Sequence, residues 1–181
     1  MLNSSTQLKS SNTLARQIHS KFENAREIVR TLLTQNQSKY SFTTDTWTSP
    51  AGIPFMAITV HFINEDWHLF SFLLDFIWFQ SQHSGTEISN VFKSVIIDFK
   101  LKERLLAICA DNASNNDTFI QDLLDTGYLK DREGHIRCFG HVLNLAAQDA
   151  LREIQTSIDS LREGIKSLSL SPLKMEEFGR I

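Results

Sequence analysis

Three strand-like segments follow one another between residues 41 and 79, and this run constrains the fold more than any other feature. Segment 41–48 is dense in Thr and aromatic residues, which suit a pleated, packed surface. Segment 54–64 has apolar residues on both faces, so we expect both faces to be covered. Segment 67–79 is almost continuously apolar. Because the links between these segments are short, they predict an antiparallel meander.

Helical periods precede and follow the strands. Apolar residues recur at three- and four-residue steps from residue 12 to about 35, with Ser11, Asn12 or Thr13 as the predicted cap. A capping-box sequence at 84–87 opens a second helical pattern that runs to residue 99. The all-apolar run 105–110 indicates a strand buried on both faces, and helical patterns then cover 117–124 and 136–161. This order predicts an α/β fold in which a mixed sheet, the meander plus a parallel strand, is flanked by helices.

Length and charge limit the possible functions. A chain of 181 residues suits one domain. With 18 Lys and Arg against 21 Asp and Glu, the net charge of -3 argues against a surface that binds nucleic acid by charge alone. No apolar run has transmembrane length and the N-terminus has no apolar signal core, so we expect an intracellular protein without membrane partners. Cys109 and Cys138 lie in apolar stretches, which predicts buried free thiols.

Two acids stand where a metal site would form. Asp45 interrupts the first strand, and two explanations remain open: a structural hydrogen bond, or a metal-binding carboxylate. Asp111 follows the apolar strand 105–110, and sites in α/β sheets gather at the carboxyl ends of parallel strands. If strands 41–48 and 105–110 are parallel neighbours, the two carboxylates converge. A divalent cation would then relieve their repulsion, and two such ions can hold the reacting oxygens of a phosphoryl transfer.

Three segments carry a family resemblance: Thr-Thr-Asp-Thr-Trp-Thr at 43–48, Ala-Asp-Asn-Ala-Ser-Asn-Asn at 110–116, and Arg-Cys-Phe-Gly-His-Val-Leu-Asn-Leu at 137–145. Their order and spacing resemble the ribonuclease H-like core of hAT-family (hobo/Ac/Tam3) DNA transposases, and of similar BED zinc finger, RICESLEEPER-like proteins derived from them. The resemblance covers roughly residues 12–160. It implies a ribonuclease H-like sheet within a core that we place at 12–165. The Ser-, Asn- and Thr-rich residues 1–11 predict a disordered N-terminus, and the Ser-Pro-Leu sequence at 171–173 predicts an irregular tail over 166–181.

The resemblance implies a nuclear enzyme that cuts and joins DNA at transposon ends, using two Mg²⁺ or Mn²⁺ ions held by Asp, Asp and Glu. Asp45 would be the first catalytic acid and metal ligand, and Asp111 the second. Asn112 and Asn115 adjoin the second acid, where they would position it or only shape the turn.

Cys138 and His141 match the Cys-x-x-His signature of the family. As a zinc site the pair is two ligands short. We therefore expect either a positioning role for His141, near the DNA or the acids, or an ordinary core histidine.

The third acid of the family follows a large helical insertion, and none is identified in this chain. The late acids lack the family context; they are Glu153, Glu163, Glu176 and Glu177. The BED finger and the dimerisation segment are not found either. We therefore expect a truncated core that retains two of three acids and is not catalytically competent alone, and that self-associates through uncovered apolar surface.

Two alternatives remain. One is a domesticated module that binds nucleic acid or protein without catalysis. The other is a complete nuclease or phosphotransferase site, in which Asp75, Asp98 or Glu87 supplies the third ligand. Against the second alternative, we expect Asp98 to be solvated and Asp75 to face outward from an edge strand.

Overall fold

The computed structural model describes residues 10–79 and 84–169, and the chain divides into two compact units, Met1–Ile136 and Arg137–Ile181. The predicted core, 12–165, extends across the boundary between these units. Its two limits remain a prediction. Most of the predicted disordered N-terminus and of the predicted tail lies outside the described residues. Within those residues, no helix combines the length and apolarity needed to cross a membrane.

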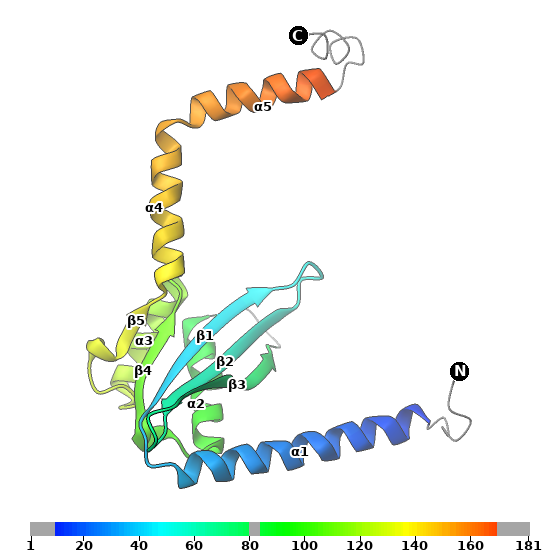
Figure 1. Ribbon diagram of the computed structural model, residues 1–181, viewed down its shortest axis with the longest axis vertical. Helices are drawn as coiled ribbons and strands as arrows, with labels where there is room; N and C mark the ends of the chain where they lie inside the picture. Colours follow the sequence, from blue (N-terminus) through cyan, green and yellow to red (C-terminus); the bar gives the residue numbers. More distant parts are fainter. Residues whose placement is uncertain (1–9, 80–83, 170–181) are drawn as a thin grey trace. The chain divides into compact units, whose positions relative to one another are not determined.

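The first unit is an α/β domain (Figure 1). Its elements, together with the short strand at the boundary between the units, are α1 (Ser11–Gln35), β1 (Tyr40–Thr48), β2 (Pro54–Ile63), β3 (Leu69–Trp78), α2 (Gly85–Asp98), the 3-10 turn η1 (Lys102–Arg104), β4 (Leu105–Ala110), α3 (Ser114–Asp125), the 3-10 turn η2 (Arg132–Gly134) and β5 (His135–Arg137).

The five strands form one mixed sheet in the order β3-β2-β1-β4-β5. β1 pairs antiparallel with β2, and β2 antiparallel with β3, as the short links predicted. β4 lies parallel to β1 on the other side, with Thr43 opposite Cys109. The predicted α/β fold with a ribonuclease H-like mixed sheet is therefore confirmed.

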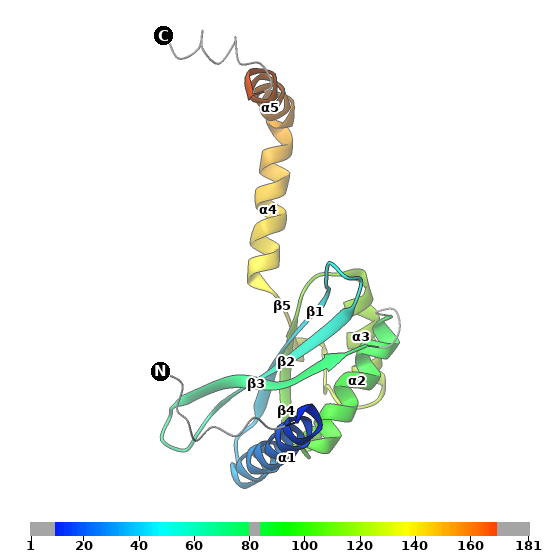
Figure 2. The same cartoon turned by 90° about the vertical axis from the view of Figure 1, so that its right-hand side faces the viewer.

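The helices of this unit cover one face of the sheet (Figure 2). On that face the ring of Phe42 in β1 meets Phe92 of α2 edge-on, with centroids 5.6 Å apart, and Phe92 meets Phe119 of α3 at 5.5 Å. Met56 and Ile58 of β2 are fully buried beside them. Alternation along β1 and β2 therefore sends one set of side chains into an aromatic core.

The opposite face of the sheet carries exposed aromatic and aliphatic side chains. Its exposed members are Trp47, Ile63, Leu69, Leu73, Phe76 and Trp78. The expectation that both faces of β2 are covered is therefore only half right, because its second face is no more than partly buried. We call this surface the open face, and it becomes important for the site.

α1 packs only through its C-terminal part. Its cap is Ser10, whose side chain accepts a hydrogen bond from the Thr13 amide, so the predicted caps at Ser11–Thr13 were placed too late. Almost every residue from 11 to 25 is exposed, whereas Leu33 is buried. The capping box of α2 was located correctly, since Ser84 accepts from the Glu87 amide.

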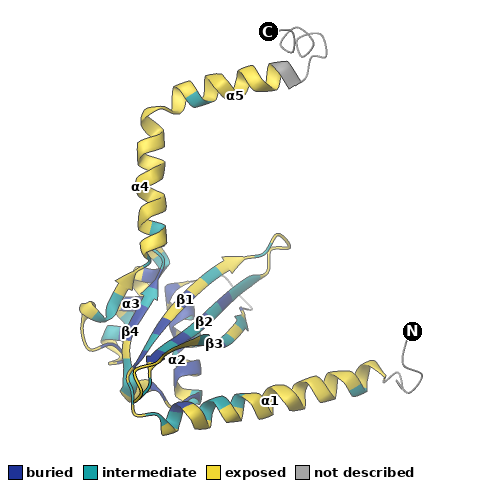
Figure 3. Cartoon of the chain, viewed as in Figure 1, coloured by how far each residue is buried: buried dark blue, intermediate teal, exposed yellow. Residues whose placement is uncertain are grey.

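The second unit contains two helices, α4 (Phe139–Glu153) and α5 (Gln155–Ser169). The single long helix predicted over 136–161 was wrong at both ends. His135–Arg137 is extended as β5, and Ile154 leaves the helical conformation at φ -108° and ψ 11°. α5 continues to Ser169, beyond residue 166, where the predicted tail begins. Nearly all described side chains of these helices are exposed (Figure 3).

Candidate functional site

The parallel pairing of β1 with β4 brings the two predicted acids to the same end of the sheet. The register pairs Thr43 with Cys109, and each acid lies two residues further along its own chain segment. Because side chains alternate with a period of two, Asp45 keeps the orientation of Thr43, toward the open face. Asp111 directly follows Ala110, the last residue of β4. The converging carboxylates expected from the sequence thus have the strand pairing that they require.

Asp45 is an exposed acid in a largely aromatic neighbourhood. Its pairing partner in β2 is Ala57, and the next pair on the same face of the sheet is Trp47 with Phe55. The rings of Trp47 and Phe55 lie 5.9 Å apart, and Phe76 of β3 lies 5.6 Å from Trp47. An exposed carboxylate has no desolvation cost to offset, so a compensating structural hydrogen bond is not required. This removes the main reason for the structural explanation of Asp45.

Asp111 is held in place by the start of α3. Its Oδ1 accepts a hydrogen bond from the Ala113 amide at 3.0 Å, which closes a tight turn after β4. Asn116, which is buried, donates from Nδ2 to the same Oδ1 at 2.5 Å and to the Asp111 carbonyl at 3.2 Å. The second acid is therefore half-buried and fixed, whereas the first is exposed.

The loop between β4 and α3 is packed closely against α2. A Cβ atom on Gly85, the first residue of α2, would lie 2.3 Å from the carbonyl oxygen of Asn115. Asn112 Oδ1 is buried and accepts no hydrogen bond from the described residues. We singled out Asn112 and Asn115 from the sequence, but the side chain shown holding the acid is Asn116. The sequence signal for Asn116 is its spacing of five residues from Asp111. This spacing places Asn116 in the first turn of α3, from which its side chain reaches back to the acid.

Cys138 and His141 belong to the second unit, whereas both acids belong to the first. Cys138 is the N-cap residue of α4, and its carbonyl accepts from the Val142 amide at 3.1 Å. His141 lies in the first turn of the same helix, and both side chains are half-buried. Cys109 is half-buried as well, and neither cysteine forms a disulfide, so the predicted burial of the two thiols is only partial.

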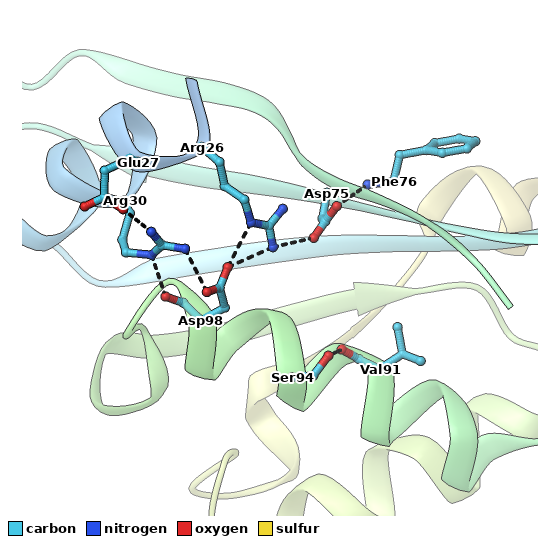
Figure 4. Close-up of polar contacts among 8 residues, drawn as sticks. All are labelled: Arg26, Glu27, Arg30, Asp75, Phe76, Val91, Ser94 and Asp98. Atoms are coloured by element: carbon cyan, nitrogen blue, oxygen red, sulfur yellow. Dashed lines mark hydrogen bonds and ion pairs between the residues drawn. The ribbon is translucent and has the colours of Figure 1, made fainter. Parts of the chain in front are cut away.

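Two of the three alternative third ligands, Asp75 and Asp98, are engaged in ion pairs with α1 (Figure 4). Asp75 lies on the helix-covered face, with a side chain only 13% exposed, and pairs with Arg26 of α1 at 2.9 Å. The expectation that Asp75 faces outward was therefore wrong. Asp98 pairs with Arg26 at 2.8 Å and with Arg30 at 2.7 Å, so it is not simply solvated. Over 10–79 and 84–169, no three His, Cys, Asp or Glu side chains gather closely enough to hold a metal ion.

Known proteins resemble the chain over nearly its whole length. A family model described as "ZBED1 RNase-like domain" matches residues 43–135, and one described as "ZBED1 RNase-like helical domain" matches 136–181. The boundary between the two matches coincides with the boundary between the two structural units, to within a residue.

Individual relatives agree with the family models. A Zea mays protein named "Putative AC transposase" is 31% identical over 150 residues, covering 78% of this chain and 18% of its own length. "Zinc finger BED domain-containing protein RICESLEEPER 2" of Oryza sativa subsp. japonica is 26% identical over 178 residues, covering 93% of this chain and 24% of its own length. The chain thus spans less than a quarter of either relative. With the mixed sheet and both family models in agreement, the chain belongs to the hAT family of transposase-derived proteins.

Proposed function

We propose that the first unit is the two-acid part of a nucleotidyl-transfer core, in which Asp45 and Asp111 bind Mg²⁺ or Mn²⁺. The observation that supports this proposal is the parallel register of β1 and β4, which sets both acids two residues beyond the Thr43–Cys109 pair. Transposon-end DNA in the nucleus is the proposed partner, by the resemblance to transposases and BED zinc finger proteins.

The residues present fit a hard divalent cation. Mg²⁺ is typically bound by one or two carboxylates, with water and substrate phosphate oxygens completing its coordination. Asp45 is accessible, and Asp111 is fixed through its Oδ1 by the Ala113 amide and Asn116. A bound ion would neutralise the charge that develops on phosphate oxygens during transfer. Two carboxylates of this kind make a metal-binding pair, with one fixed ligand and one adaptable ligand.

The isolated chain, on this proposal, binds metal but does not cleave DNA. The described residues offer no third carboxylate beside Asp45 and Asp111, and Asp75 is already paired with Arg26. We expect the 181-residue chain to show no turnover in a nicking assay on transposon-end DNA. Robust cleavage that Asp45→Ala abolishes would overturn this part of the proposal.

Calorimetric titration with Mn²⁺ tests the metal site directly. The wild-type chain is expected to bind, and Asp45→Asn and Asp111→Asn are each expected to weaken binding at least about tenfold, because each removes a charged ligand. Glu23→Gln on the exposed part of α1 is the matched control, since it removes one carboxylate far along the sequence from the site. If all four proteins bind Mn²⁺ equally, the acids are not the site.

A second candidate function is a binding module without catalysis. The observation in its favour is the open face, where Phe76 is 52% exposed and Trp78 is 62% exposed. Exposed apolar patches of this kind often mark interaction surfaces. Wild-type protein that fails to bind Mn²⁺ in the titration above would favour the module over the metal core.

For the Cys-x-x-His pair we propose a positioning role at the start of α4. Cys138 occupies the N-cap and His141 the first turn, so both sit at one helix terminus. His141→Ala is expected to leave the unfolding of the first unit unchanged while lowering affinity for transposon-end DNA. Equal DNA affinity in a gel-shift measurement would contradict this role.

A further inference from the structure

We infer that Asn116 is a positioning residue for Asp111, holding the carboxylate so that one of its oxygens is presented to the metal ion. This inference rests on the proposed function of Asp45 and Asp111 as metal ligands. Asn116 touches the acid through its side-chain amide. It ends the segment 110–116 of the family resemblance, but no function was drawn for it from that resemblance. It acts through Asp111 and is not itself a ligand in this proposal.

The contacts of Asn116 fix the acid at two points. Its Nδ2 donates to the Asp111 carbonyl at 3.2 Å and to Oδ1 at 2.5 Å. The Ala113 amide donates to the same Oδ1 at 3.0 Å. The Asn116 and Ala113 donors therefore use Oδ1, and we assign Oδ2 to the ion. Without the Asn116 amide, the carboxylate would retain one donor and could rotate about χ1 and χ2 more freely.

Asn116 is itself firmly held. It is 5% exposed and belongs to the first turn of α3, where its backbone amide donates to the Ala113 carbonyl at 2.9 Å. Its position in the helix, five residues after the acid, turns its side chain back toward the end of β4. A buried amide anchored by its own helix is a rigid support for a ligand carboxylate, as metal sites commonly require.

The affinity for Mn²⁺ alone tests the inference on the whole 181-residue chain. Asn116→Ala removes the donor, and Asn116→Leu removes it while keeping the branched shape and the number of side-chain heavy atoms. Each is expected to weaken Mn²⁺ binding roughly tenfold, the lower end of the effect seen for second-sphere ligands. Loss of the Mn²⁺ affinity in Asn116→Leu cannot be attributed to a cavity.

Ser89→Ala is the matched control for lost stability. Ser89 is fully buried at the interface of α2 with α3 and hydrogen-bonds Asp122, so its loss also removes a buried polar contact of α3. It does not touch Asp111. We expect Ser89→Ala to lower the free energy of unfolding but to keep the wild-type affinity for Mn²⁺.

A measurement without metal gives a second readout. In the metal-free chain, Asp111→Ala should shift the NMR resonances of the Asn116 side-chain amide, because its acceptor oxygen is gone. Unchanged resonances would overturn the inference, whatever the metal affinity.

The outcomes separate the two proposals. If wild-type protein binds Mn²⁺ and both Asn116 variants bind equally well, Asn116 is not a positioning residue while the metal site stands. If wild-type protein does not bind Mn²⁺, the metal site falls and the inference falls with it.

Discussion

Arg26 of α1 is bound to Asp75 of β3, with Nη2 2.9 Å from Oδ2, and this pair joins the first helix to the far edge of the sheet. The same guanidinium pairs with Asp98 and lies over the ring of Phe99, 4.7 Å from its centroid. Burial acts to lower the pKa of Arg26, but the hydrogen bonds and charges of Asp75 and Asp98 raise it above its ordinary value. α1, which precedes the matched residues 43–135, is thus bound to the core by ion pairs as well as by its buried C-terminal part.

Arg26→Met is expected to lower the free energy of unfolding by about 2 kcal/mol. The substitution removes charge-assisted hydrogen bonds and leaves Asp75, with its side chain 13% exposed, without this cation. Urea unfolding followed by circular dichroism measures the effect. Arg16→Met, on the exposed part of the same helix, is the control and should change stability by less than about 0.5 kcal/mol. Equal effects of the two substitutions would show that the cluster around Arg26 does not stabilise the fold.

Asp122 of α3 should titrate below the ordinary range of an aspartate. A hydrogen bond from Lys93, at 2.6 Å, lowers its pKa most, and the Ser89 hydroxyl lowers it further, while burial opposes both. NMR titration of the Asp122 carboxyl carbon measures this pKa. Lys93→Met should raise it toward the ordinary value of about 3.9. A pKa that is the same in both proteins would contradict the assignment.

The lowered pKa of Asp122 also predicts the direction of a pH effect. A folded-state pKa below the unfolded value contributes stability that is fully present above the unfolded value. It is lost as the pH falls through the folded value. The stability difference between wild type and Lys93→Met should therefore shrink as the pH is lowered below about 4. A constant difference across that range would argue against the contribution of this pair.

Gly85→Ala should destabilise the first unit by about 2 kcal/mol, although Ala is the better helix former. The new Cβ would meet the Asn115 carbonyl oxygen at 2.3 Å and Thr118 Cβ at 2.6 Å, so α2 and α3 must separate. Gly164→Ala in α5 is the matched control, because a Cβ there meets nothing within 4 Å. It should strengthen its helix by up to about 1 kcal/mol. Thermal unfolding compares the stability of the two variants. A Gly85→Ala protein as stable as the wild type would refute the close approach of α2 and α3.

The open face should make the chain self-associate at high concentration. Leu73 is 55% exposed in the middle of β3, beside other exposed apolar side chains. Leu73→Glu is expected to reduce self-association in sedimentation velocity without loss of stability. Ile28→Glu, which replaces an apolar residue 68% exposed on α1, should have no such effect. A wild-type chain that remains monomeric at high concentration would contradict the prediction.

Much of the fold could be predicted from local pattern. The meander, the parallel strand and the capping box at Ser84 were confirmed, because short links, a continuous apolar run and cap chemistry are encoded by neighbouring residues. The break at Ile154 could not be predicted, because the helical period of its apolar residues continues through it. Periodicity records which side chains would face a core, whereas α4 and α5 expose nearly all of theirs.

For the candidate site, the sequence by itself determined which acids could meet: Asp45 inside one strand and Asp111 at the end of another. Only the tertiary structure decided what surrounds them. In the folded chain Asp75 accepts a hydrogen bond from Arg26, a residue 49 positions away, and Asp111 accepts one from the Asn116 side-chain amide. The physical reason is that an ion pair or hydrogen bond forms only when two groups lie about 3 Å apart in space. The number of residues between two groups along the chain does not determine that distance.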